Sequence, residues 1–198
     1  MVDITAKMVK ELRDRTGSGM MDCKNTLVET KGNVDKAIEL LRKKGLAKAA
    51  KRSGRATSEG IVYSYIHAGS KLGVLLEINC ESDFVAKTDD FIQFAKNVAM
   101  HIAASNPLGI SEDDISKDII EKEREVYKAL AIKEGKPENI VDKIVDGKVQ
   151  KYYKDVCLMK QQYIKDPQLT IADLLNEAVA KIGENIQIRR FSRFKIGE

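Results

Sequence analysis

The spacing of apolar residues in the first 45 positions predicts three short helices. Apolar residues recur there every three to four positions, in three runs that end at Gly17, Gly32 and Gly45. This period is that of an amphipathic helix, and glycine is favoured where a helix stops. Thr5 can cap the first helix, and the third helix starts at Asn33. The N-terminal residues 1–46 are therefore predicted to form a three-helix bundle.

A basic stretch without an apolar period follows at residues 47–59. Small residues separate its basic side chains, which are Lys48, Lys51, Arg52 and Arg55. We expect a solvated linker that begins as an extension of the third helix and loses its helical structure near Gly54.

The apolar period then becomes that of extended strands. Alternation over residues 61–66 predicts a first strand, and residues 67–71 can form a turn. The run Leu72–Cys80 is mostly apolar and predicts a second, buried strand antiparallel to the first. Residues 185–196 alternate again and predict a final strand, with Ile186, Ile188, Arg190, Ser192 and Phe194 on one side.

Helical spacing returns between the second strand and the last one. A helix is predicted from Thr88 to Ser105. A capped acidic start at Ser111 leads into a long helix, which Gly135-Lys136-Pro137 breaks before a second long helix. Two helices with charged outer faces and a tight turn between them predict an antiparallel hairpin.

A shorter set of elements is expected after the hairpin. Residues 162–164 can form a short strand, and Asp166-Pro167 is predicted to be a turn. Thr170 can cap a further helix that Gly183 closes.

Together these elements predict an α+β fold. An antiparallel sheet with helices on one face forms a core from residues 60–110 and 157–198. The helical hairpin, residues 111–156, is inserted between the two parts of this core.

The loop after the second strand carries the most informative candidate residues, Ser82, Asp83 and Phe84. Serine and aspartate favour such loops because their side chains bond nearby backbone N–H groups. A large apolar ring is unusual at a polar loop tip. Phe84 either packs beneath the loop, which is the commoner arrangement for an aromatic ring, or is offered to a partner.

Composition excludes several classes of function. The 198 residues are 32% charged with a net charge of only +4, and they include no tryptophan. This balance argues against a dedicated nucleic-acid binder. The three cysteines form no Cys-x-x-Cys pair, so neither a disulfide framework nor a metal site is predicted. We expect a soluble cytoplasmic protein without a signal peptide, a membrane span or a cofactor.

Two stretches of the chain resemble the signature segments of the elongation factor Ts family. In Glu77–Lys87, an Asn-Cys pair leads to Ser-Asp-Phe-Val, where the family has Thr-Asp-Phe-Val. Ser82 thus replaces a threonine and keeps its hydroxyl. Leu12–Lys24 resembles the N-terminal signature, which continues to Leu27 with Thr26 where the family has Ala or Val. The resemblance extends to Lys181–Arg190 and covers essentially the whole chain.

The resemblance implies a guanine-nucleotide exchange factor for elongation factor Tu, acting in translation elongation without chemistry of its own. It implies that Asp83 and Phe84, flanked by Ser82 and Val85, probe the G domain of elongation factor Tu near its Mg²⁺ and phosphate groups. Contacts to the same partner are implied for Arg13, Met20, Met21 and His67. The resemblance also implies a ubiquitin-associated-like N-terminal bundle and a coiled-coil hairpin.

Longer members of the family carry two similar core halves, whereas this chain has sequence for one. Residues 67–75 resemble one half, and residues 79–87 and 181–190 resemble the other. We therefore expect a homodimer that forms a two-to-two complex with elongation factor Tu. A symmetric contact between the two sheets is the most economical geometry for this dimer, because exposed strand edges or faces otherwise invite association.

Two other classes of function remain open from the sequence. The first is a ribosome- or RNA-associated binding module that uses the basic linker and the hairpin, and its binding would weaken steeply with salt. The second is a small enzyme that uses His67 with Cys80 or Glu77, which requires an unusually reactive thiol.

Overall fold

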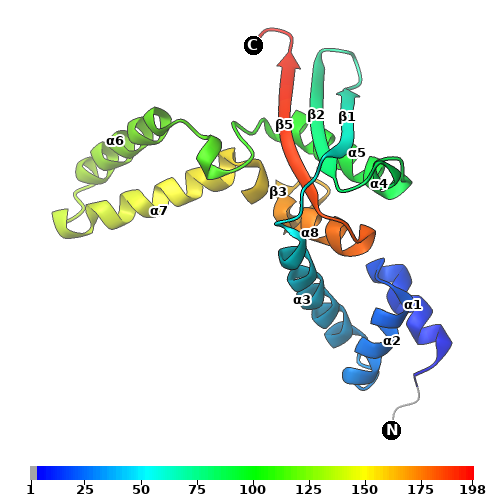
Figure 1. The fold of residues 1–198 in the computed structure, drawn as a ribbon. Helices are drawn as coiled ribbons and strands as arrows, with labels where there is room; N and C mark the ends of the chain where they lie inside the picture. The colour runs from blue at the N-terminus through cyan, green and yellow to red at the C-terminus, as the bar shows by residue number, and fades with distance from the viewer. Residues whose placement is uncertain (1–3) are drawn as a thin grey trace. The chain divides into compact units, whose positions relative to one another are not determined.

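The computed structural model describes residues 4–198 as a mixture of helices and antiparallel strands, which confirms the predicted α+β class. The helices are α1 (Ala6–Thr16), α2 (Met20–Glu29), α3 (Val34–Arg52), α4 (Asp83–Ala86), α5 (Asp89–Ser105), α6 (Lys117–Lys133), α7 (Glu138–Val156) and α8 (Ile171–Ile182), and the 3-10 turns are η1 (Glu112–Asp114) and η2 (Leu158–Lys160) (Figure 1). The strands are β1 (Glu59–Ile66), β2 (Leu72–Cys80), β3 (Gln162–Tyr163), β4 (Asp166–Thr170) and β5 (Ile186–Lys195).

The described chain divides into two compact units, and the division follows packing instead of sequence order. The first unit contains the residues up to Tyr63 together with Leu76–Lys96 and Asp173–Arg189. The second contains Ser64–Leu75, Asn97–Ala172 and Arg190–Glu198. The border crosses β1, β2, α5, α8 and β5, so it does not follow the changes of apolar pattern along the chain.

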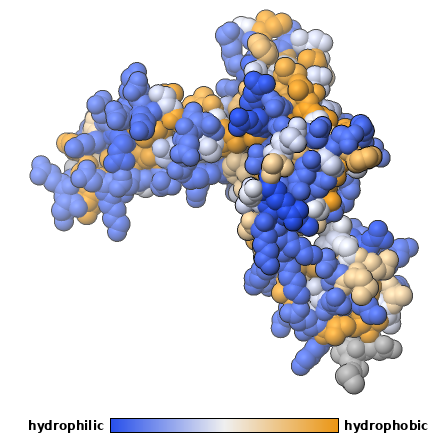
Figure 2. Space-filling view, in the orientation of Figure 1, coloured by the Kyte–Doolittle hydropathy of each residue, from blue (hydrophilic) through white to orange (hydrophobic). Residues whose placement is uncertain are grey.

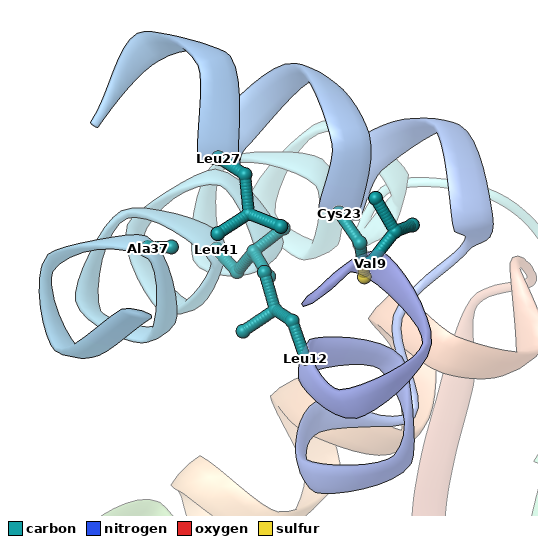
Figure 3. Packing of buried hydrophobic residues seen from close by; sticks show 6 residues of the cluster. All are labelled: Val9, Leu12, Cys23, Leu27, Ala37 and Leu41. Carbon is teal, nitrogen blue, oxygen red and sulfur yellow. The ribbon is translucent and has the colours of Figure 1, made fainter. Parts of the chain in front are cut away.

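Helices α1 and α3 begin where the sequence predicts, and α1 also ends there. The Thr5 hydroxyl accepts the N–H of Met8 at 3.3 Å, and the Asn33 side chain accepts the N–H of Lys36 at 2.9 Å. Gly17 ends α1 with a φ of 64°, a left-handed conformation that glycine adopts without strain. The three helices enclose an apolar cluster (Figure 3) made of Val9, Leu12, Cys23, Leu27, Ala37 and Leu41.

Helix α3 continues beyond the predicted domain end and stops at Arg52, as expected for a linker that begins as a helical extension. Gly45 lies inside this helix instead of ending it. A Cβ atom at Gly45 would lie 3.2 Å from the Cβ of Ala180. The absence of a side chain therefore lets α3 approach α8 closely within the first unit.

One sheet has the strand order β1-β2-β5 (Figure 1). The N–H of His67 bonds the carbonyl of Leu72 at 2.8 Å and closes the β1–β2 hairpin. The N–H of Ile196 bonds the carbonyl of Lys71 at 3.0 Å, so β5 runs antiparallel to β2. From Val74 onward every second residue of β2 is buried, whereas Leu75 between two of them is exposed, so one face of this strand is covered and the other is more open.

The last strand departs from the predicted alternation. Ile186 and Ile188 are buried as expected, but Phe194 on the same predicted side is exposed. Phe191 is half-buried, and Arg193 donates from Nε to the carbonyl of Ala103 in α5 at 3.1 Å. The covered positions therefore change by one residue along β5, and a shift of one residue exchanges the two faces of a strand.

The predicted helical hairpin is formed by α6 and α7, which pack through Ala131, Val141, Val145 and Val149. Backbone bonds close its base, including Leu158 N–H to Gly109 carbonyl at 2.9 Å. Ser111 does not start the long helix, because its cap closes the short turn η1 through Asp114. Helix α6 begins only at Lys117.

The predicted turn at Asp166-Pro167 is wrong, because both residues belong to β4. The reversal occupies the two residues before Asp166, and Tyr163 pairs with Asp166 across the two-stranded sheet. Proline lacks an N–H and is tolerated at the start of a strand or on an edge. No helix among the described residues is long and apolar enough to cross a membrane.

A buried histidine joins α5 to the segment after the hairpin. His101 is fully buried, and its Nε2 lies 2.9 Å from the Oε1 of Gln161. Its Nδ1 accepts the N–H of Ile164 at 3.4 Å. These partners fix a neutral ring with the proton on Nε2. Burial lowers the pKa of His101, and the bond to Gln161 offsets only part of this effect.

We predict that this histidine makes stability depend on pH below its ordinary pKa of 6.5. The pKa is lower in the folded state, so the unfolded chain takes up the proton first as pH falls. The contribution of His101 to the free energy of unfolding is complete above pH 6.5. It is lost as pH drops toward the pKa of the folded state. Urea unfolding between pH 7.5 and 5 should show this loss in the wild type and not in His101→Gln. The exposed His67→Gln variant is the control. If the free energy of unfolding of His101→Gln falls with pH as steeply as that of the wild type, the prediction is contradicted.

Candidate functional site

The end of β2 delivers a short ordered loop that opens directly into α4. Ser82 is the N-cap of this helix, and its hydroxyl accepts the N–H of Val85 at 3.4 Å. The thiol of Cys80 donates to the carbonyl of Ser82 at 3.1 Å. Ala86 is buried, and Val85 is half-buried. Local hydrogen bonds and one buried face therefore fix the four residues that the sequence singled out.

Phe84 points away from this framework. Its side chain is 79% exposed. Of the two arrangements open from the sequence, packing beneath the loop is thus not the one that the structure adopts. A phenyl ring held in water on an ordered turn is available to fill an apolar pocket of another molecule.

Asp83 lies beside Phe84 and carries a stable negative charge. Lys87 contacts it at 2.7 Å across one helical turn. The hydrogen bond from Lys87 lowers the pKa of the Asp83 carboxyl below its ordinary value. Both groups are solvent-exposed, so the pair contributes little to stability. It adds a defined polar pair beside the exposed ring.

The acids around this loop do not form a metal cage. The described residues hold no group of three or more metal-ligating side chains. Asp90 pairs with Lys181 at 2.6 Å, and Glu81 contacts Arg55 at 3.4 Å. Thr88 accepts the N–H of Phe91 and caps α5, as predicted. These acids serve ion pairs and helix starts instead.

A second group of predicted residues lies on the N-terminal helices of the same unit. Met20 and Met21 open α2 and are 52% and 63% exposed, so neither one fills the small core of the bundle. Arg13 is exposed on α1. Methionine adapts its shape to irregular surfaces, and the tandem pair thus forms a second apolar spot available to a partner.

His67 lies in the turn between β1 and β2, in the second unit. It is exposed, and its Nδ1 lies 2.9 Å from the hydroxyl of Tyr65. Cys80 is fully buried, and burial raises the pKa of its thiol to about 11. A thiol of this kind is protonated at neutral pH and is a poor nucleophile. The geometry therefore gives no support to an enzyme built on Cys80.

The basic linker is partly neutralised by nearby acids. Lys48 contacts Asp22 at 2.8 Å, and Arg55 contacts Glu81 at 3.4 Å. Cations already paired with carboxylates contribute less to phosphate binding. No specific feature of this stretch favours the RNA-binding interpretation.

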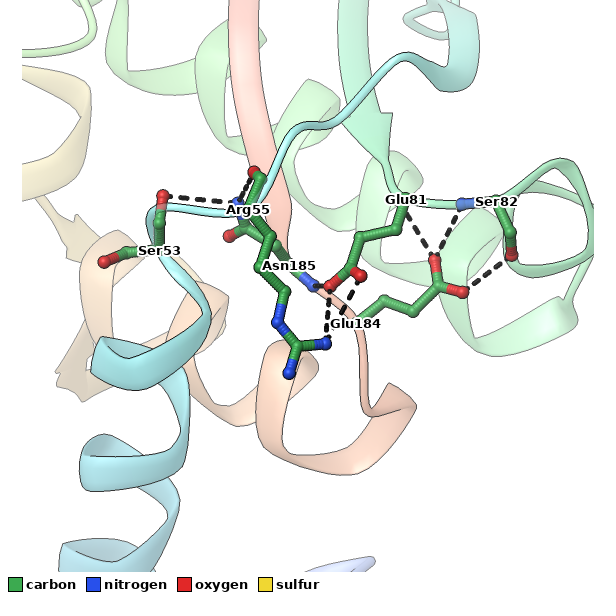
Figure 4. A network of polar contacts seen from close by, with 6 residues as sticks. All are labelled: Ser53, Arg55, Glu81, Ser82, Glu184 and Asn185. Atoms are coloured by element: carbon green, nitrogen blue, oxygen red, sulfur yellow. Dashed lines mark hydrogen bonds and ion pairs between the residues drawn. The ribbon is translucent and has the colours of Figure 1, made fainter.

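The side chains that hold the loop (Figure 4) are not among the residues that the sequence predicts for the site. Glu184 and Asn185, just before β5, contact the backbone and side chains of Glu81 and Ser82. Glu184 lies 102 residues from Ser82 along the chain. The only available signal was that Lys181–Arg190 resembles a family segment, and this did not indicate its partner.

Comparisons with known proteins give one consistent result. A family model described as Elongation factor TS matches residues 2–198. The chain is 64% identical over 195 residues to elongation factor Ts of Desulfosudis oleivorans, with 98% of each chain covered. It is 57% identical to that of Syntrophobacter fumaroxidans, over 99% of this chain and 98% of the relative. It is 56% identical to that of Caldanaerobacter subterraneus subsp. tengcongensis, with 98% of each covered.

Proposed function

The chain belongs to the elongation factor Ts family, and from this premise we propose that it is a guanine-nucleotide exchange factor for elongation factor Tu. Family membership supports this role in translation elongation. The observation that carries the mechanism is the exposed ring of Phe84 on an ordered loop. In the proposed mechanism, the Asp83-Phe84 tip enters the G domain near the Mg²⁺ and phosphates, and GDP leaves.

The physical basis of release is negative coupling between two ligands of one partner. If this protein weakens GDP binding to elongation factor Tu, then GDP weakens binding of this protein by the same ratio. GTP can then displace the factor, so the factor is recovered after each exchange. No covalent step is required. GDP release is favoured by contacts that form only when the nucleotide contacts loosen.

Several further residues complete the proposed contact surface. Val85 and Asp83 flank the ring, and Ser82 caps the helix that carries it. The exposed pair Met20 and Met21, with Arg13 nearby in sequence, is proposed to contact the G domain. His67 is proposed as an additional contact to the same partner.

We predict that Phe84→Ala reduces the rate of GDP release more than tenfold when this protein is present at a limiting concentration. Buried aromatic anchors typically cost about 2 kcal/mol or more when truncated. Release of a fluorescent GDP from elongation factor Tu measures the rate. Because the ring is exposed in the free protein, the melting temperature should not change. Ile132→Ala, at an exposed position of α6, is the control. A fully active Phe84→Ala variant would refute the proposal that Phe84 anchors the contact with elongation factor Tu.

We also propose that two copies of the chain associate through the second unit. Apolar side chains are exposed along a groove of about 510 Å³ on this unit. Figure 2 shows apolar surface gathered over the strands. The exposed residues in question are Ile66, Leu75, Phe194 and Ile196. A symmetric contact would cover the same patch on both copies, and a second copy would supply the core half that longer family members carry in one chain.

We predict a dimer by size-exclusion chromatography with light scattering at micromolar concentration. Phe194→Asp should shift the mass toward one copy, because a charge would be buried in an apolar contact. Ile132→Asp places the same charge on the hairpin, outside the patch, and should leave the mass unchanged. A wild-type protein that is strictly monomeric yet fully active in exchange would rule out the dimer.

A further inference from the structure

We infer that Glu184 is a positioning residue for exchange, because its carboxylate holds the Glu81–Ser82 backbone in the form that presents Phe84. The inference rests on the proposed function, since it assigns a role in the same loop. Glu184 does not itself need to touch elongation factor Tu. It acts through Ser82 and α4.

Three donors converge on the carboxylate of Glu184. Its Oε2 accepts the N–H of Glu81 at 3.1 Å and the N–H of Ser82 at 3.0 Å. Its Oε1 accepts the hydroxyl of Ser82 at 2.6 Å. The two N–H groups lie just beyond β2, where the strand ladder ends. Backbone donors need a partner, and an ionised acceptor makes stronger bonds than a neutral one.

The contacts of the Ser82 hydroxyl fix its direction. A serine hydroxyl has one proton and two lone pairs. A carboxylate only accepts, so the proton of Ser82 points at Glu184. A lone pair is thereby left for the N–H of Val85, which the same oxygen caps at 3.4 Å. Glu184 thus sets the orientation in which Ser82 starts α4, and α4 carries Phe84.

A reciprocal bond runs in the opposite direction (Figure 4). The carboxylate of Glu81 accepts the N–H of Asn185 at 2.6 Å. The side-chain amide of Asn185 donates to the carbonyls of Arg55 at 2.8 Å and Ser53 at 3.3 Å. Each of the two segments therefore supplies a glutamate that binds backbone N–H groups of the other. A loop held from both sides in this way loses less freedom when its tip binds a partner.

The test compares release of fluorescent GDP from elongation factor Tu by wild type, Glu184→Ala and Glu184→Gln. Alanine removes all three bonds, and we expect the rate to fall roughly tenfold, or about 1.4 kcal/mol. Glutamine keeps one oxygen for the N–H groups and can donate to the Ser82 oxygen, so it should lie between the two. Glu29→Gln is the matched control, because Glu29 makes an exposed ion pair with Lys44 and should keep full activity.

A double-mutant cycle separates positioning from a general structural role. If Glu184 acts through the ring, Glu184→Ala should cost little further activity in a Phe84→Ala background. The cycle is measured at factor concentrations where Phe84→Ala still exceeds spontaneous release. The inference is overturned if the losses of activity in the two single variants multiply fully in the double variant. It is also overturned if the Glu184→Ala protein has wild-type activity.

Amide hydrogen exchange of the free chain tests the same contact without elongation factor Tu. The amides of Glu81 and Ser82 should exchange at least about tenfold faster in Glu184→Ala, because opening of the loop exposes them. The amide of Leu27 in the N-terminal core should not change. Unchanged protection of both loop amides would overturn the inference. A wild type with protected amides and no effect on GDP release would instead refute the proposed function.

Discussion

The structure of the candidate site depends on one exchange of charged hydrogen bonds between distant segments. Where β2 ends, its backbone loses the neighbouring strand that would accept its N–H groups. The carboxylate of Glu184 accepts the next two N–H groups instead. Glu81 returns the contact to the N–H of Asn185. Carboxylates are suited to this position because each oxygen accepts more than one bond and carries charge. The turn before β5 is thereby joined to the turn after β2.

This constraint explains how an apolar ring can stand in water without disordering its loop. The short helix α4 buries only Ala86 on its inner side, so packing alone holds it weakly. The bonds from Glu184 through Ser82 supply order that packing does not. Phe84 then remains exposed and positioned, so its apolar surface is accessible to another molecule. Binding by an ordered loop costs less conformational entropy than binding by a mobile one.

Local signals in the sequence predicted the elements well, whereas contacts between distant residues could not be predicted. The caps at Thr5, Asn33 and Thr88 were identified because each bonds a backbone group three residues away. Asp166-Pro167 was misassigned because its turn propensity was outweighed by pairing with β3. The exposure of Phe84 depends on what packs around the loop. The partners of Glu184 lie about a hundred residues away, and no periodicity connects them.

In the proposed mechanism, docking of this chain and binding of GDP to elongation factor Tu oppose each other. The most direct test measures the dissociation constant of this chain for elongation factor Tu with and without saturating GDP, and that of GDP with and without the chain. Linkage requires that both ratios be equal. We expect GDP to weaken binding of the chain to elongation factor Tu, and the chain to weaken binding of GDP by the same factor. Equal affinity for the nucleotide-free and GDP-bound forms would contradict it.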